Sequence, residues 1–156
     1  MSYNPLPSLP LVAACTLALT AAAAGSILIN EMELNPPEGG TGWVELYNTG
    51  NSSVDISGWT AAITDGGWVG KIMAPEGAMI PPKAFYVLEG STSWNHNDGG
   101  FATLYDESGI KMDKTPTRID SLNNDFAWGR RPDGYDTDTD GDFGLGRGTK
   151  GKPNKI

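Results

Sequence analysis

Cysteine and histidine, the side chains that most often act as nucleophile, base or metal ligand, are almost absent from this sequence. Cys15 is the one cysteine and His96 the one histidine among 156 residues. A Ser-His-Asp triad needs a histidine beside its nucleophile, and a zinc site usually draws on several histidines or cysteines. Cys15 also lies in an apolar N-terminal run, whose removal would leave no thiol for a disulfide. The sequence therefore predicts neither a triad nor a zinc site.

Positive charge is scarce as well, because 11 lysines and arginines stand against 19 aspartates and glutamates, for a formal net charge of -8. A negative surface repels phosphate backbones and anionic lipids over long distances, so nucleic acid is not an expected partner. The tail after Asp142 is an exception that holds cations without acidic neighbours: Arg147, Lys150, Lys152 and Lys155. We interpret this tail as a solubilising end, with a small anion-binding face as the alternative.

Charged side chains are missing altogether from Met1 to Ala24, within which Leu9–Ala24 is a largely apolar run. Its small terminal residues fit the cleavage site of a secretory signal, although the preceding segment lacks the usual lysine or arginine. The run is about 16 residues long, short of the roughly 20 that a bilayer core requires. We expect residues 1–24 to be a signal segment removed on export, which predicts a secreted or cell-surface protein. The alternatives are a retained anchor, which alone would place the chain at a membrane, and a lipoprotein signal at Cys15.

Helical periodicity is also lacking from Ser26 onward, while 21 glycines and 11 prolines indicate frequent turns. Short alternating segments take its place. Val44 and Leu46 alternate with more polar neighbours, as in a strand with one face in a core. We expect this strand, residues 42–48, to form a hairpin with a second strand that starts near Val54 and extends to Thr64. Other strands are expected at residues 26–34, 68–73, 85–88, 101–105, 110–112 and 126–128. This spacing predicts an all-β sandwich or barrel.

Several motifs, in this order, resemble those of the lamin tail domain. They are Ile29-Asn30-Glu31, WVELYN at 43–48, DISGW at 55–59, PPKAFYVL at 81–88, AWGR at 127–130 with PDG at 132–134, and TKGKPN at 149–154. The resemblance implies an immunoglobulin-like β-sandwich over residues 26–154. Such domains are interaction modules in nuclear lamins, and in bacteria and archaea they occur in exported or cell-surface proteins, often beside hydrolases. The family brings no catalytic residues, so the resemblance implies a protein that is not an enzyme.

The most specific chemical motif is the sequence DTDTDGD at residues 136–142. In a calcium loop, positions 1, 3 and 5 supply oxygens, position 6 is glycine and position 7 coordinates through its carbonyl. The match assigns four residues to the ion: Asp136, Asp138, Asp140 and Asp142. Position 12 is Arg147 rather than a glutamate, so we expect calcium as a weakly bound cofactor, with a Kd of about 10⁻⁴ to 10⁻³ M. The alternative is a solvated acidic loop that neutralises three arginines: Arg130, Arg131 and Arg147.

Two glutamates are candidates for paired-carboxylate chemistry. Glu31 and Glu45 could serve as the acid and base of a glycosidase if they flanked a substrate. Both, however, lie in strand motifs, and the sequence gives no indication of a cleft. We expect them to hydrogen-bond neighbouring loops, because a buried carboxylate needs partners.

Five tryptophans are the remaining candidates for ligand contacts. Trp59 and Trp128 are expected to pack between the sheets. Aromatic rings among asparagines and aspartates can form sugar-binding platforms, and on this basis we expect Trp68 and Trp94 to contact a ligand.

Together these patterns predict a non-catalytic binding module, stabilised by calcium if the aspartate loop binds it, at the surface of a prokaryotic cell or outside it. Its expected partner is a protein or a surface polysaccharide. Two alternatives remain. The chain could be a structural subunit of a surface layer or filament, or it could be a secreted nuclease or glycosidase or the accessory domain of one.

Overall fold

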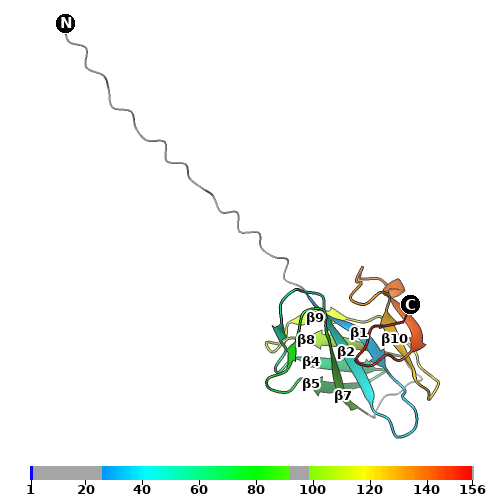
Figure 1. Cartoon of the computed structure of the whole chain (residues 1–156). Coiled ribbons are helices and arrows are strands. Elements are labelled where there is room, and N and C mark those ends of the chain that lie inside the picture. Colours follow the sequence, from blue (N-terminus) through cyan, green and yellow to red (C-terminus); the bar gives the residue numbers. More distant parts are fainter. Residues whose placement is uncertain (2–25, 92–98, 156) are drawn as a thin grey trace.

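The computed structural model describes Met1 and residues 26–91 and 99–155 (Figure 1). The predicted signal segment falls almost entirely outside these residues, as do Trp94 and His96. No helix in the described part of the chain has the length and apolar character needed to cross a membrane.

The domain is built from two main antiparallel sheets. The first has the strand order β11-β10-β1-β2-β7 and the second the order β5-β4-β8-β9, while β3 and β6 form a small ribbon of their own. The strands of the first sheet are β1 (Ile27–Glu33), β2 (Gly42–Asn48), β7 (Phe85–Ser91), β10 (Phe126–Arg130) and β11 (Phe143–Arg147). Those of the second are β4 (Thr60–Asp65), β5 (Trp68–Met73), β8 (Gly100–Tyr105) and β9 (Lys111–Lys114), and the ribbon pairs β3 (Val54–Asp55) with β6 (Met79–Ile80). This arrangement confirms the predicted all-β, immunoglobulin-like sandwich.

The core lies between the two sheets. Val44 and Leu46 of β2 face Ile63 of β4 and Leu104 of β8 in one cluster, and all four side chains are inaccessible to solvent. Trp59 belongs to the same cluster, and Trp128 packs against it, as predicted. Each fully buried aliphatic side chain of this size contributes about 1.5–3 kcal/mol, so the alternation in these strands is the main source of the fold's stability.

The predicted hairpin from residue 42 to residue 64 is wrong. β2 pairs with β1 and β7, whereas β3 pairs with β6 and β4 lies in the other sheet. Asn48 supplies the physical reason, because its amide nitrogen donates to the carbonyls of Ser52 (2.8 Å) and Ile80 (2.9 Å), and its Oδ1 accepts from Gly50 N (2.8 Å). These bonds bend the chain away from β2 and toward the β3-β6 ribbon.

The first strand is buried along its entire length, including its polar residues. A β-bulge between Ile29 and Glu31 interrupts its pairing with β2, and Asn30 is the extra residue. Bulges re-aim side chains, and here the Asn30 amide donates to Glu45 Oε1 (3.1 Å) and Asp133 Oδ1 (2.9 Å). The outer side of β1 therefore carries a polar network, which the C-terminal residues cover.

Candidate functional site

The two glutamates considered as an acid–base pair lie beneath the C-terminal segment. Glu31 is 2% exposed and Glu45 is fully buried. Thr149 donates to Glu31 from its backbone nitrogen (3.0 Å to Oε1) and from its hydroxyl (3.0 Å to Oε2), and Gly151 N donates to Glu45 Oε2 at 2.6 Å. The expectation that these glutamates hydrogen-bond neighbouring loops is confirmed. We call Glu31, Glu45, Thr149 and Gly151 the C-terminal clasp.

Asn154, near the end of the chain, also holds the C-terminal segment against the first sheet. The Asn154 amide nitrogen donates to the carbonyl oxygens of Arg130 (2.9 Å) and Asn30 (3.2 Å), so it ties the chain end to β10 and β1. Gly129 leaves room for it, since a Cβ at this position would lie 2.7 Å from Asn154 Nδ2. Figure 1 shows the C-terminus beside β10. The TKGKPN motif therefore holds the end of the chain over the first sheet.

Burial dominates the acid–base properties of the glutamates in this region. It raises the pKa of Glu45 to about 7, against hydrogen bonds from Asn30 and Gly151 that lower it, and it also raises the pKa of Glu31 despite the Thr149 bonds. Glu33 reaches a pKa of about 8 for the same reason, with one opposing bond from Asn35 N. Raised carboxyl pKa values also occur in active sites, but here the carboxyl groups face the protein's own backbone.

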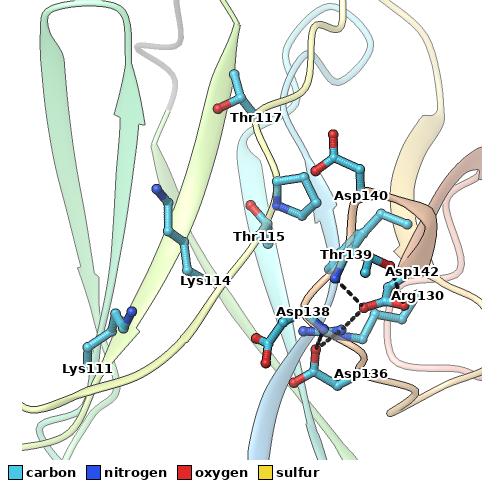
Figure 2. Close-up of a pocket in the computed structure, with 12 residues that line it drawn as sticks. Lys111, Lys114, Thr115, Thr117, Arg130, Asp136, Asp138, Thr139, Asp140 and Asp142 are labelled. Atoms are coloured by element: carbon cyan, nitrogen blue, oxygen red, sulfur yellow. Dashed lines mark hydrogen bonds and ion pairs between the residues drawn. The ribbon is translucent and has the colours of Figure 1, made fainter.

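A polar pocket of about 280 Å³ lies between β9 and the aspartate loop (Figure 2). Lys111 and Lys114 stand on the β9 side, and the loop with its four aspartates stands on the other. Thr115, Pro116 and Thr117 line the pocket between these two sides, and Arg130 and Phe143 also contribute to its lining. Charges of both signs therefore border the same small space.

Arg130 is the buried centre of this region. Its Nε donates to the carbonyl of Ile29 (2.8 Å), and its two terminal nitrogens reach Asp113 Oδ2 (3.0 Å) and Asp136 Oδ1 (2.9 Å). Asp142 Oδ2 lies 3.7 Å from Nη1, and the guanidinium stands 4.8 Å from the centre of the Phe143 ring. One buried cation thus compensates three carboxylates from two different parts of the chain.

The aspartate loop is held by bonds to Asp142, which is 3% exposed. Its carboxylate accepts from the backbone nitrogens of Thr137 (2.8 Å) and Thr139 (3.2 Å) and from the Thr137 hydroxyl (2.6 Å). Burial alone would raise the pKa of Asp142, but these bonds and the Arg130 charge outweigh it, and the pKa falls below its usual value. A short 3₁₀ turn, Asp140–Asp142, follows and leads into β11.

The four aspartates assigned to calcium divide into two pairs. Asp136 and Asp142 form ion pairs with Arg130, whereas Asp138 and Asp140 point to solvent, with Asp140 Oδ2 3.8 Å from Arg118 Nη1. Among the described residues, no group of three or more Asp, Glu, His or Cys side chains is arranged to hold a metal ion. Calcium binding stays a prediction, and calorimetric titration with millimolar calcium tests it, because an absence of heat would contradict it.

The structure also identifies which arginines the aspartate loop neutralises. Arg130 does so, as the acidic-loop alternative predicted, but Arg147 pairs with Asp125 at 2.9 Å and Arg131 donates to the carbonyl of Leu145. Arg118, which sequence reasoning missed, donates to the Asp140 carbonyl at 2.5 Å and forms an ion pair with the Asp140 carboxylate at 3.8 Å. Asp113, Lys111 and Lys114 were missed as well, since no motif marks their segment.

A larger groove of about 640 Å³ runs along the outer face of the second sheet. Its floor consists of the short side chains of Thr60, Ala62, Thr64 and Thr103. Val69, Lys71 and Met73 of β5 flank it on one side, and Phe101 and Tyr105 of β8 flank it on the other. Trp68, the predicted ligand contact, is half-buried and packs against the core, so its contact with a ligand stays a prediction.

Two packed antiparallel sheets define an immunoglobulin-like β-sandwich module, and this one adds the C-terminal clasp and the polar hollows of its outer face. Residues 20–124 match the family model of the Lamin Tail Domain, which is more than half of the chain. The chain belongs to the lamin tail domain family. The match ends before β10, so the aspartate loop and the two C-terminal residues of the clasp, Thr149 and Gly151, lie beyond it, whereas Glu31 and Glu45 lie within it.

Two further comparisons, with curated proteins and with solved structures, give no evidence about function. No curated protein matches the sequence. Among solved structures, the archaellum periplasmic stator protein FlaG from Sulfolobus acidocaldarius is similar, with a TM-score of 0.43 and 11% sequence identity over 58% of this chain and 96% of that one. A similarity of this size carries no inference about function.

Proposed function

We propose that this chain is a non-catalytic binding module that acts outside the cell or at its surface. One observation carries the proposal. The paired glutamates, the best candidates for catalysis in the sequence, are closed off by the C-terminal clasp, and their oxygens accept bonds from the protein itself. Catalysis by such a pair needs a substrate between the carboxyl groups, and residues 149–151 occupy that side.

The polar groups that remain available to a ligand lie on the outer surface of the domain. The groove of the second sheet and the pocket beside the aspartate loop are two hollows that present polar side chains to solvent. Hollows lined by a few polar groups on a rigid sheet suit recognition. The apolar N-terminal run supports export, and an exported module meets surface polysaccharides and proteins as its first available partners.

Retention on the cell envelope tests this proposal. Protein purified from cells that express the full-length chain is mixed with envelope fragments of its host and sedimented. We expect labelled protein to co-sediment with the envelope in a saturable way, and an excess of unlabelled protein to displace it. Protein that stays in the supernatant at every concentration would contradict a binding role, and protein that sediments without envelope would instead favour the structural-subunit alternative.

A further inference from the structure

Strand pairing places two lysines in one row across the second sheet: Lys71 lines the groove, and Lys114 lies beyond its β8 side, where it also lines the pocket beside the aspartate loop. Lys71 of β5 is opposite Ala62 of β4, Ala62 is opposite Thr103 of β8, and Thr103 is opposite Lys114 of β9. Directly paired residues share one face of a sheet, and neighbouring strands are about 4.8 Å apart. The two lysines therefore begin about 14 Å apart, with only short side chains between them.

The rows on either side add aromatic rings and hydroxyls. Thr64 is opposite Phe101, and Thr60 is opposite Tyr105, so each ring of β8 stands beside a threonine of the groove floor. Both rings are partly exposed. This places ring faces and hydroxyl groups along the same side of the groove.

Neither lysine of the row has an ion-pair partner in the part of the chain that the structure describes. Within residues 26–91 and 99–155, no carboxylate lies within ion-pair distance of Lys71 or Lys114, and Lys114 Nζ stands 4.0 Å from the centre of the Phe101 ring. In a chain with a net charge of -8, these two cations place positive charge on the middle of the outer face of the second sheet, where Lys71 is the one cation among the described residues that line the groove. Asp106 and Glu107 lie at one end of the groove, which restricts the positive site to its middle.

The position of the groove argues against a peptide as its occupant. Extended peptides usually bind by adding a strand to a free sheet edge. β4 forms the floor and pairs with β5 on one side and β8 on the other, so its main-chain groups are already used. A peptide that lay on the floor of the groove, rather than along the edge of β5, would have to bind through side chains alone, over a floor rich in threonine. A sugar chain needs no main-chain partner, because its rings stack on aromatic faces and its hydroxyls bond to hydroxyls.

We propose that this groove binds an acidic polysaccharide, whose carboxylate or sulfate groups pair with Lys71 and Lys114 while its rings contact Phe101 and Tyr105. The inference rests on the proposed binding function and names the class of its ligand. The sequence predicted Trp68 and Trp94 as ligand contacts, whereas this inference places the ligand site on the outer face of the second sheet.

Calorimetric titration of the full-length protein tests the proposal with four probes: polygalacturonate, dextran sulfate, neutral dextran and polyglutamate. We expect binding of at least one acidic polysaccharide and none of neutral dextran or polyglutamate. The double variant K71A/K114A is expected to bind about tenfold more weakly, which corresponds to roughly 1.4 kcal/mol. Lys71→Arg together with Lys114→Arg should restore binding, because both retain the charge.

A matched control removes the same charge elsewhere, with Lys83→Ala and Lys152→Ala, and should leave affinity unchanged. Tyr105→Ala separates ring contact from simple charge attraction, since it should weaken polysaccharide binding at constant charge. Equal losses in the two double variants, equal binding of polyglutamate, or a dimer in light scattering that excludes the probes would overturn the inference. If the K71A/K114A protein still co-sediments fully with envelope, this inference fails while the binding function stands.

Discussion

Replacing Arg130 with methionine is expected to lower the free energy of unfolding by about 3–5 kcal/mol, the usual cost of removing one partner from a buried ion pair. Arg130 is 1% exposed and compensates Asp113, Asp136 and Asp142. Without its charge, the buried carboxylates of Asp113 and Asp142 lose their cation, and the Ile29 carbonyl loses a hydrogen-bond donor. Urea unfolding followed by tryptophan fluorescence measures the loss.

Two further variants show that position and geometry determine this effect. Arg147→Met removes an arginine of an exposed pair, whose side chains are 73% and 52% exposed, so the expected loss is at most about 1 kcal/mol. Arg130→Lys keeps the charge but not the planar fork that reaches Ile29, Asp113 and Asp136 together, so it should restore only part of the stability. Equal losses for Arg130→Met and Arg147→Met would contradict the central position of Arg130.

Stability is expected to fall as pH rises from about 5 to 8, and Glu33 should be the largest single cause. Burial raises its pKa from 4.5 to about 8, and nearby Asp120 adds to the shift. Between these two values the folded chain holds a proton that the unfolded chain has lost, so each rise in pH favours unfolding. The contribution is fully present below pH 4.5 and is lost by about pH 8. Since one pKa unit corresponds to about 1.4 kcal/mol, the loss amounts to a few kcal/mol.

Glu33→Gln tests this directly, because an amide has the same shape and no titration. Urea unfolding at a series of pH values should give a flatter slope for Glu33→Gln than for the wild type, with a residual slope from Glu31 and Glu45, whose pKa values are raised as well. Glu38→Gln, at an exposed position, is the control and should keep the wild-type slope. An unchanged slope in Glu33→Gln would show that burial does not govern this carboxyl group.

Much of the fold could be predicted from alternation and turn residues alone. The segments that became β1, β2, β5, β7, β8 and β10 all carry apolar residues at strand spacing, and burial of one face determines their role. The predicted hairpin over residues 42–64 was wrong because a single buried side chain, Asn48, bends the chain away from β2 through hydrogen bonds to the carbonyls of Ser52 and Ile80. β11 was missed because Gly144 and Gly146 weaken its strand pattern.

The sites were harder to predict because their partners are distant in the sequence. Asp113 meets Arg130 across 17 positions, and Glu31 meets Thr149 across 118. The aspartate loop was found from its spacing, yet spacing could not reveal that Arg130 stands among its carboxylates. The lysine row depends on the pairing of four strands, and a β-bulge between Leu104 and Tyr105 adjusts its register.

The claim that this chain binds rather than catalyses is tested most directly by assaying nuclease and glycosidase activity in the wild type and in Glu45→Gln. Glu45 is fully buried and bonded to Asn30 and Gly151, so the account predicts no turnover above background in either protein. Turnover by the wild type that disappears in a folded Glu45→Gln protein would contradict it.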